Sequence, residues 1–206
     1  MFPLGTVLLP GAGLPLHVFE PRYRQLVVDI LAADGEPEFG VVLIERGSEV
    51  GGGESRTAVG TVARLLDAHV SADGRYGLMT AGIRRIRVVS WLADDPYPRA
   101  DVEDWPDVVD RRDERHLGDR LAALSQRLDE VWALARRTSD GLDERADQDI
   151  SDDPVLASYH LTALAPIGPA DRQRALAAPG PRERLDLLTA SLDDVEALLR
   201  FRLGES

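Results

Sequence analysis

The histidines and serines are the side chains best suited to chemistry in this sequence, and their spacing argues against catalysis. Four histidines, His17, His69, His116 and His160, are scattered, and none falls in a His-x-x-x-His or similar metal-ligand spacing. Ser158 and His160 are two residues apart, so on a helix they cannot share a face as a nucleophile and its base would. No Gly-x-Ser-x-Gly elbow occurs. The pattern predicts no catalytic residue and no metal site, with a structural role for His160.

Two residue types that carry much enzyme chemistry are missing. All 24 basic side chains are arginine, and the chain has neither lysine nor cysteine. A phosphate-binding P-loop and a Schiff-base enzyme both need a lysine, and disulfides, thiolate nucleophiles and Cys-based zinc sites need cysteine. We therefore expect a protein that is not an enzyme and needs no cofactor. A small-molecule hydrolase with unrecognised residues stays open as an alternative.

The charge of the chain opposes binding to polyanions. The net charge is −12, and acidic residues outnumber arginines both before and after Asp104. We therefore expect no DNA ligand, and RNA is not expected either. A local basic strip is still possible at Arg84, Arg85 and Arg87. In a strand, Arg85 and Arg87 share one side and Arg84 lies opposite, and we expect them to form a solvated face.

The apolar runs are too short for a membrane protein. No run of about 18 apolar residues occurs. The N-terminal stretch has no basic region before it, and Pro3, Pro10 and Gly11 interrupt it, which is unlike a signal peptide. The sequence predicts a cytoplasmic protein with no membrane contact.

The first half of the chain has the pattern of short strands around one helix. A helix is expected to begin at Pro21, after Glu20, and to end near Gly35. Gly47–Ser55 is expected to be a Gly-rich loop, which could cover a binding groove, and Asp73-Gly74 a hairpin turn. The predicted strands are Leu4–Leu9, Leu14–Phe19, Phe39–Glu45, Thr57–Val70 with a bulge at Gly60, Tyr76–Ala81, Ile83–Trp91 and Tyr97–Trp105. Such strands predict a small closed or half-closed barrel.

The second half is helical, and the change falls near residues 105–112. Pro154, Pro169 and Pro181 each suit the first turn of a helix, and a polar loop is expected at Thr138–Asp153. One long helix before them has an apolar stripe made of Leu117, Leu121, Leu124, Leu128, Val131, Trp132 and Ala135. The sequence thus predicts an α+β protein with a barrel domain at residues 1–108 and a helical bundle at residues 109–206.

A resemblance to a known family spans nearly the whole chain. The N-terminal segments that carry it are Phe2-Pro3-Leu4, Leu9-Pro10-Gly11, Leu14-Pro15-Leu16 and Phe19-Glu20-Pro21-Arg22-Tyr23. Further matches are Phe39-Gly40-Val41-Val42, Gly60-Thr61, Asp73-Gly74-Arg75, Gly82 with Arg85 and Arg87, Tyr97, Val102-Glu103, Asp171-Arg172-Gln173 and Arg184-Leu185. This pattern resembles the LON substrate-binding domain of the ATP-dependent Lon proteases. The resemblance implies a PUA-like β-barrel with one inserted helix, followed by a helical bundle. Because such a barrel belongs to a class with RNA binders, RNA or nucleotide binding through the PUA-like barrel stays open as an alternative.

The resemblance also implies a function. Lon's peptidase uses a Ser–Lys dyad, which a chain without lysine cannot form. We therefore expect a non-catalytic module that binds proteins or peptides, with self-association left open. The expected site is an apolar groove between barrel and bundle. Its candidate residues are Leu14, Leu16, Phe19, Glu20, Arg22 and Tyr23. For the last four, the alternative is structural: Glu20 caps the helix, Phe19 and Tyr23 pack inside, and Arg22 pairs with an acid.

Overall fold

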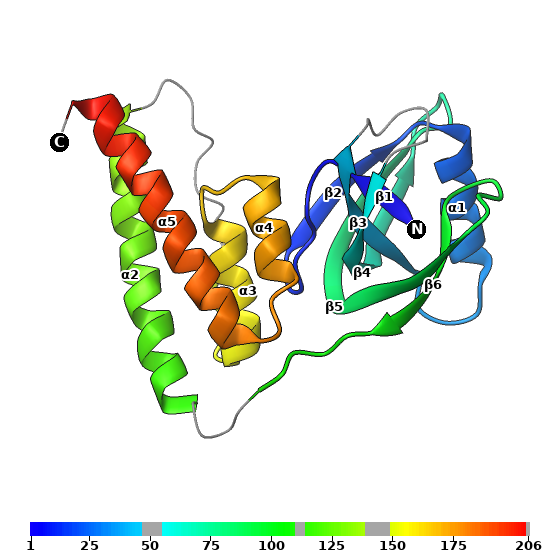
Figure 1. Ribbon diagram of the computed structural model, residues 1–206. Coiled ribbons are helices and arrows are strands. Elements are labelled where there is room, and N and C mark those ends of the chain that lie inside the picture. Colours follow the sequence, from blue (N-terminus) through cyan, green and yellow to red (C-terminus); the bar gives the residue numbers. More distant parts are fainter. Residues whose placement is uncertain (47–54, 110–113, 139–148, 205–206) are drawn as a thin grey trace. The chain divides into compact units, whose positions relative to one another are not determined.

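The computed structural model describes residues 1–46, 55–109, 114–138 and 149–204. The expected loops at Gly47–Ser55 and Thr138–Asp153 therefore lie mostly outside the described residues. The chain divides into two compact units, Met1–Pro106 and Asp107–Ser206. The first holds a mixed sheet and one helix, and the second holds four helices (Figure 1).

Six strands form the sheet of the first unit. They are β1 (Phe2–Leu4), β2 (Gly13–Val18), β3 (Glu38–Arg46), β4 (Ser55–Val70), β5 (Tyr76–Leu92) and β6 (Arg99–Asp104). The strand order is β1-β3-β4-β5-β2, and β6 also pairs with β5. Only the β1–β3 pair is parallel. The α+β class is thus confirmed. The described pairings form an open path, so closure into a barrel stays a prediction.

The first predicted strand is wrong beyond Leu4. Leu8 and Leu9 are buried in the irregular segment that joins β1 to β2. A buried irregular backbone needs other partners for its polar groups. Thr61 supplies one, because its hydroxyl donates to the Leu8 carbonyl over 2.6 Å. The apolar run of the sequence therefore reports burial of this segment and not strand pairing.

The predicted break at Gly82 is also wrong, because β5 runs through it as one long strand. A side chain at Gly82 would collide with the Leu9 carbonyl. The backbone of Gly82 accepts from Gly11 and donates to Ala12, each over 2.9 Å. Glycine here permits close approach of the β1–β2 connection and does not end the strand. Near Gly60 the bulge is confirmed, since the β3–β4 register shifts between Arg56 and Gly60.

Helix α1 (Pro21–Ala32) begins at the predicted proline. Its buried face, with Leu26 and Val27, packs into the core of the sheet. The Tyr23 ring stacks on Phe2 of β1 with 4.1 Å between centroids. The first turn of α1 is therefore fixed against the end strand of the sheet.

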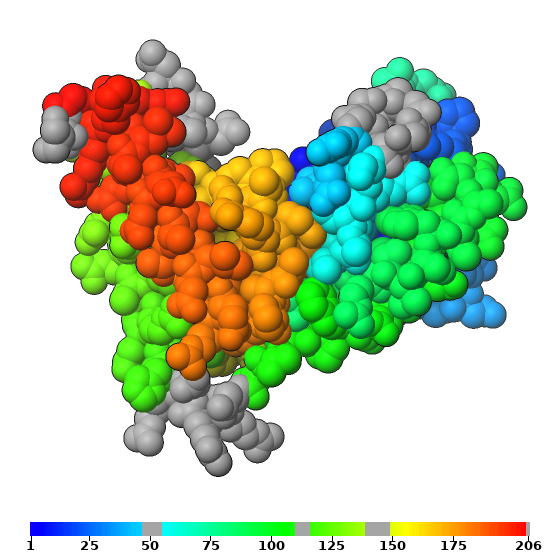
Figure 2. All heavy atoms as spheres, viewed as in Figure 1, coloured from blue at the N-terminus to red at the C-terminus, as the bar shows by residue number. Residues whose placement is uncertain are grey.

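The second unit contains α2 (Glu114–Thr138), α3 (Pro154–Leu164), α4 (Pro169–Leu176) and α5 (Pro181–Leu203). All three proline-started helices are confirmed, and the Asp153 side chain caps α3 by accepting from the Leu156 N–H over 2.8 Å. Helix α5 runs across the visible face of this unit beside α2 and α4 (Figure 2). The predicted stripe of α2 lies in the core, where the Trp132 indole donates to the Leu164 carbonyl.

Arg184 of α5 is a buried hub of the second unit. It has no exposed surface. Its guanidinium donates to the Ala175 carbonyl over 3.1 Å and to the Ser158 hydroxyl over 2.8 Å, and it pairs with the Asp107 carboxylate. It also lies 3.5 Å from the centroid of the Tyr159 ring, whose hydroxyl donates to Asp107. The Arg184–Asp107 pair thus ties the start of the unit to α3, α4 and α5.

Candidate functional site

The predicted groove residues all lie in the first unit, where β2 leads into α1. Leu16 and Tyr23 are buried, and Leu14 is half-buried against the same core. Phe19 is 53% exposed, so its predicted internal packing is wrong. Sequence reasoning had offered packing as the structural alternative to a ligand contact.

Glu20 and Arg22 form an ion pair at the start of α1. Glu20 is the N-cap residue, but its carboxylate makes no capping hydrogen bond. It accepts instead from the Arg22 Nε over 3.1 Å. The predicted pairing of Arg22 with an acid is therefore confirmed, and the predicted side-chain cap is wrong.

A pocket of about 140 Å³, here called the apolar pocket, opens between β1, β2 and α1. Its lining residues are Phe2, Leu4, Pro15, Leu16, His17, Val18, Phe19, Glu20 and Tyr23. The structure thus brings four of the six predicted residues around one pocket. Leu14 and Arg22 are not among the residues that line the apolar pocket. Phe2 and Leu4 belong to β1, and they were missed because the pairing of β1 cannot be read from local spacing.

The apolar pocket lies where the described sheet ends. β1 and β2 are the two ends of the strand order, and both contribute to the pocket wall. Among the pairings described, β1 pairs only with β3, and β2 only with β5. The pocket is therefore bordered by strands with one edge unpaired in the described sheet.

A second pocket of about 400 Å³, here called the histidine pocket, adjoins the first. Both pockets are lined by His17, Val18 and Phe19. The remaining residues of the histidine pocket are His69, Ser71, Asp73, Arg75, Tyr76 and Gly77. Its two histidines come from different strands. Both are opposite Gly77 in the register, His17 across the β2–β5 pair and His69 across the β4–β5 pair.

Sequence reasoning missed the grouping of these histidines. The sequence does contain a signal for the position of His69. The Asp73-Gly74 turn, confirmed with a φ of 76° at Gly74, places His69 opposite Gly77. The partner of β2 could not be read from the sequence, so the approach of His17 was hidden.

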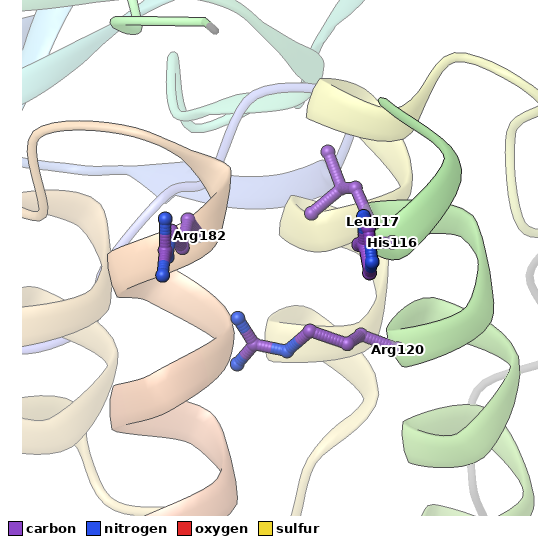
Figure 3. Close-up of a pocket in the computed structure, with 4 residues that line it drawn as sticks. All are labelled: His116, Leu117, Arg120 and Arg182. Atoms are coloured by element: carbon purple, nitrogen blue, oxygen red, sulfur yellow. The ribbon is translucent and has the colours of Figure 1, made fainter. Parts of the chain in front are cut away.

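A third pocket, of about 350 Å³, lies in the second unit. It is lined by His116, Leu117, Arg120 and Arg182, and Figure 3 shows Arg120 reaching from α2 toward α5. Arg120 forms an ion pair with Asp186 of α5. Because this ion pair engages the Arg120 guanidinium that reaches into the third pocket, the third pocket is a weaker candidate for a ligand site than the other two.

The predicted arginine strip is not a free basic surface. Arg85 is only 4% exposed, so the expected solvated face is wrong for this residue. It donates to the Trp105 carbonyl over 2.9 Å and lies 4.3 Å from the centroid of the Trp105 ring. Arg87 pairs with Glu103, and Arg84 pairs with Glu38 and Asp104. Interactions within the first unit thus engage all three guanidinium groups.

Glu38 shows the strength of this pairing. Burial pushes the pKa of its carboxyl upward, but hydrogen bonds from Arg84 and Arg64 outweigh burial and hold the pKa below its ordinary value. Glu38 therefore stays ionised and keeps Arg84 engaged.

The described residues offer no built metal site. Among them, no group of three or more His, Asp or Glu is placed to hold a metal ion. His160 is buried, and its Nδ1 accepts from the Ser151 N–H over 3.2 Å. Burial lowers the pKa of its imidazole. In the parts of the chain that are described, no helix combines the length and apolarity that crossing a bilayer requires.

The sequence family follows from a match along most of the chain. Residues 1–194 match the family described as the ATP-dependent protease La (LON) substrate-binding domain. The chain belongs to this family. The match thus covers the first unit, most of the second unit and the lining residues of the three pockets described above.

Relatives and solved structures agree with this assignment. The chain is 30% identical to Lon protease 2 of Sorangium cellulosum over 204 residues, which are 96% of this chain and 24% of that protein. It is 24% identical to the LON peptidase N-terminal domain and RING finger protein C14F5.10c of Schizosaccharomyces pombe, covering 99% of this chain and 47% of that protein. The Lon N-terminal domain protein from Xanthomonas campestris superposes with a TM-score of 0.62 at 28% identity, covering 92% of this chain and 95% of that one.

At lower sequence identity, a second solved structure supports the fold and nothing further. The N-terminal domain of Mycobacterium avium complex Lon protease gives a TM-score of 0.59 at 18% identity, over 95% of this chain and 96% of that one. The chain spans about a quarter of the length of Lon protease 2 and about half of the RING finger protein. No ATPase or peptidase domain lies within these 206 residues, which the Lon substrate-binding match almost fills.

Proposed function

We propose that this chain binds segments of other proteins without catalysis, and that the apolar pocket receives an apolar side chain of the bound segment. Membership of the Lon substrate-binding family supports the protein-binding class. The observation that carries the site is Phe19, a large aromatic side chain that is half-exposed on the rim of a pocket with a buried floor. An exposed aromatic beside an apolar cavity is typical of the centre of a binding surface.

The neighbouring strands suggest how the backbone of the ligand would bind. An extended segment can add to an unpaired strand edge through main-chain hydrogen bonds, while pockets select its side chains. β2 has such an edge among the described pairings and supplies Leu16 and Val18 to the pocket. We therefore propose an extended ligand along β2, and we keep the cytoplasmic location as part of this proposal.

The test is peptide binding by a rim variant and its matched control. Labelled peptides from an unfolded protein would be screened by fluorescence anisotropy, and those that bind would be titrated with Phe19→Ser. We expect Phe19→Ser to weaken binding at least ten-fold because the rim contact is lost. Phe201→Ser changes the same residue type at an 83% exposed position of α5, and its affinity should equal that of the wild type. Equal loss in both variants, or no bound peptide at all, would refute the site.

RNA binding is the weaker candidate because the arginines of the predicted basic strip are already engaged by groups of the protein. Arg84, Arg85 and Arg87 are held by acidic side chains, carbonyl groups and the Trp105 ring. A phosphate would have to displace these partners in a chain of net charge −12. Protein binding therefore stands as the conclusion.

A further inference from the structure

The histidine pocket brings imidazole and guanidinium groups together in a chain whose net charge is −12. His17 and His69 line it from β2 and β4. A Cβ atom at Gly77 would collide with the His69 ring, so this ring lies directly over the glycine that separates the two strands. The missing side chain at Gly77 thus gives the His69 imidazole its place on the face that also carries His17.

Two arginines border the same pocket. Arg75 belongs to its wall, and its Nε pairs with Asp73 over 2.9 Å. The side chain of Arg24, in α1, reaches the Asp73-Gly74 turn that precedes Arg75. There, the Arg24 Nη2 would lie 2.6 Å from a Cβ atom at Gly74. The charged groups around the histidines are therefore Arg24 and the Arg75–Asp73 pair. Asp67 precedes His69 by two residues in β4, and the Glu20–Arg22 pair lies at the start of α1.

Three of the nitrogen-bearing side chains around this pocket have no side-chain partner within the described part of the chain. Neither imidazole of the pocket nor the guanidinium of Arg24 takes part in a hydrogen bond or ion pair there. The nearby acids are engaged elsewhere, because Asp73 faces Arg75 and Glu20 faces Arg22. An anion in this pocket would therefore meet unpaired donors and would not displace an existing ion pair.

Building on the proposed function, we infer that the histidine pocket binds a carboxylate of the same protein segment whose apolar side chain enters the apolar pocket. The two pockets share His17, Val18 and Phe19, so one extended segment can reach both. Side chains two positions apart lie on the same face of a strand, roughly 7 Å from each other. The recognised class is thus an extended peptide with a bulky aliphatic residue and an Asp or Glu two positions away.

The experiment compares two peptides that differ in one group. A labelled, C-terminally amidated nine-residue peptide with Leu-x-Asp at its centre is titrated at neutral pH against the same peptide with Leu-x-Asn. We expect the Asp peptide to bind at least five-fold more tightly, because Arg24 and the unpaired N–H donors favour a charged carboxylate over a neutral amide. A Leu-x-Asn peptide with a free C-terminal carboxylate two positions after Leu tests whether a chain end serves as well as a side chain.

Variants assign the effect to the pocket. The double variant His17→Ala, His69→Ala removes both ring N–H donors, so it should lose the preference for Asp while it still binds the Asn peptide. His116→Ala, in the second unit, should leave the binding of both peptides unchanged. Equal binding of the Asp and Asn peptides, or an Asp preference that survives the double variant, overturns the carboxylate inference and leaves the proposed function standing. If neither peptide binds to the folded wild-type protein, the proposed function fails with it.

Discussion

Arg184 provides the sharpest test of how the second unit is held together. We consider Arg184→Ala in the full chain. The wild-type guanidinium contacts Asp107, Ser158, Ala175 and the ring of Tyr159, and none of its surface reaches solvent. Removing it leaves a buried carboxylate, a hydroxyl and a carbonyl without this donor.

The size of the effect follows from the burial of both partners. The Asp107 side chain is only 10% exposed, so water cannot fully replace the lost guanidinium. Breaking a buried ion pair by removing one partner costs about 3–5 kcal/mol. The free energy of unfolding of a typical domain is only about 5–15 kcal/mol. We therefore expect Arg184→Ala to lose much of the stability of the helical unit.

The assay is urea unfolding of the full chain followed by far-UV circular dichroism, which reports mainly on the helices. The double variant Asp107→Leu, Arg184→Met serves as the control, because replacing both charges by apolar side chains removes the uncompensated carboxylate. We expect it to recover part of the loss. A cost below about 1 kcal/mol for Arg184→Ala would refute the view that this pair ties the segment at Asp107 to α5.

Two further predictions concern single side chains of the helical unit. Gly180→Ala should destabilise the protein by about 1–3 kcal/mol because the added Cβ would collide with the Val108 carbonyl. Gly118→Ala should stabilise it by about 0.5–1 kcal/mol, because the added Cβ in α2 meets open space. Urea midpoints that shift in the same direction for both variants would contradict this. Burial lowers the pKa of His160 in the folded state below its value in the unfolded chain. As the pH falls below about 6.5, the unfolded state therefore binds more protons than the folded state, and the stability should decrease. His160→Gln should show a smaller fall in the urea midpoint between pH 7.5 and 5.5, and an unchanged fall would exclude His160 as its source.

The helical unit could be predicted well because its signals are local. Prolines at helix starts and the apolar stripe of α2 both act within a few residues. Arg184 is the exception. Its sequence context is that of an ordinary surface arginine, and only the packing of three helices places it in the core.

The sheet was harder to predict because its pairings join distant segments. Gly82 looked like a break, but the glycine is needed by Leu9, far away in the sequence. Arg85 looked like a solvated residue, but the Trp105 carbonyl and ring cover it. For the site, Leu16, Phe19, Glu20 and Tyr23 came from a contiguous motif and could be found together. The β1 wall and the His17–His69 pair depend on strand order, which no local pattern contains.

The pairing of β1 with β3 and of β2 with β5 also sets an order of events on the ribosome. The β4–β5 hairpin closes through the short turn at Asp73-Gly74, so it can form as soon as both strands emerge. β2 is synthesised far earlier but must wait for residues 76–81. Contacts between segments far apart in sequence form slowly. The apolar N-terminal segments are thus made before the strands that pair with them. During this interval the nascent chain itself exposes the kind of extended apolar segment that the finished pocket is proposed to bind.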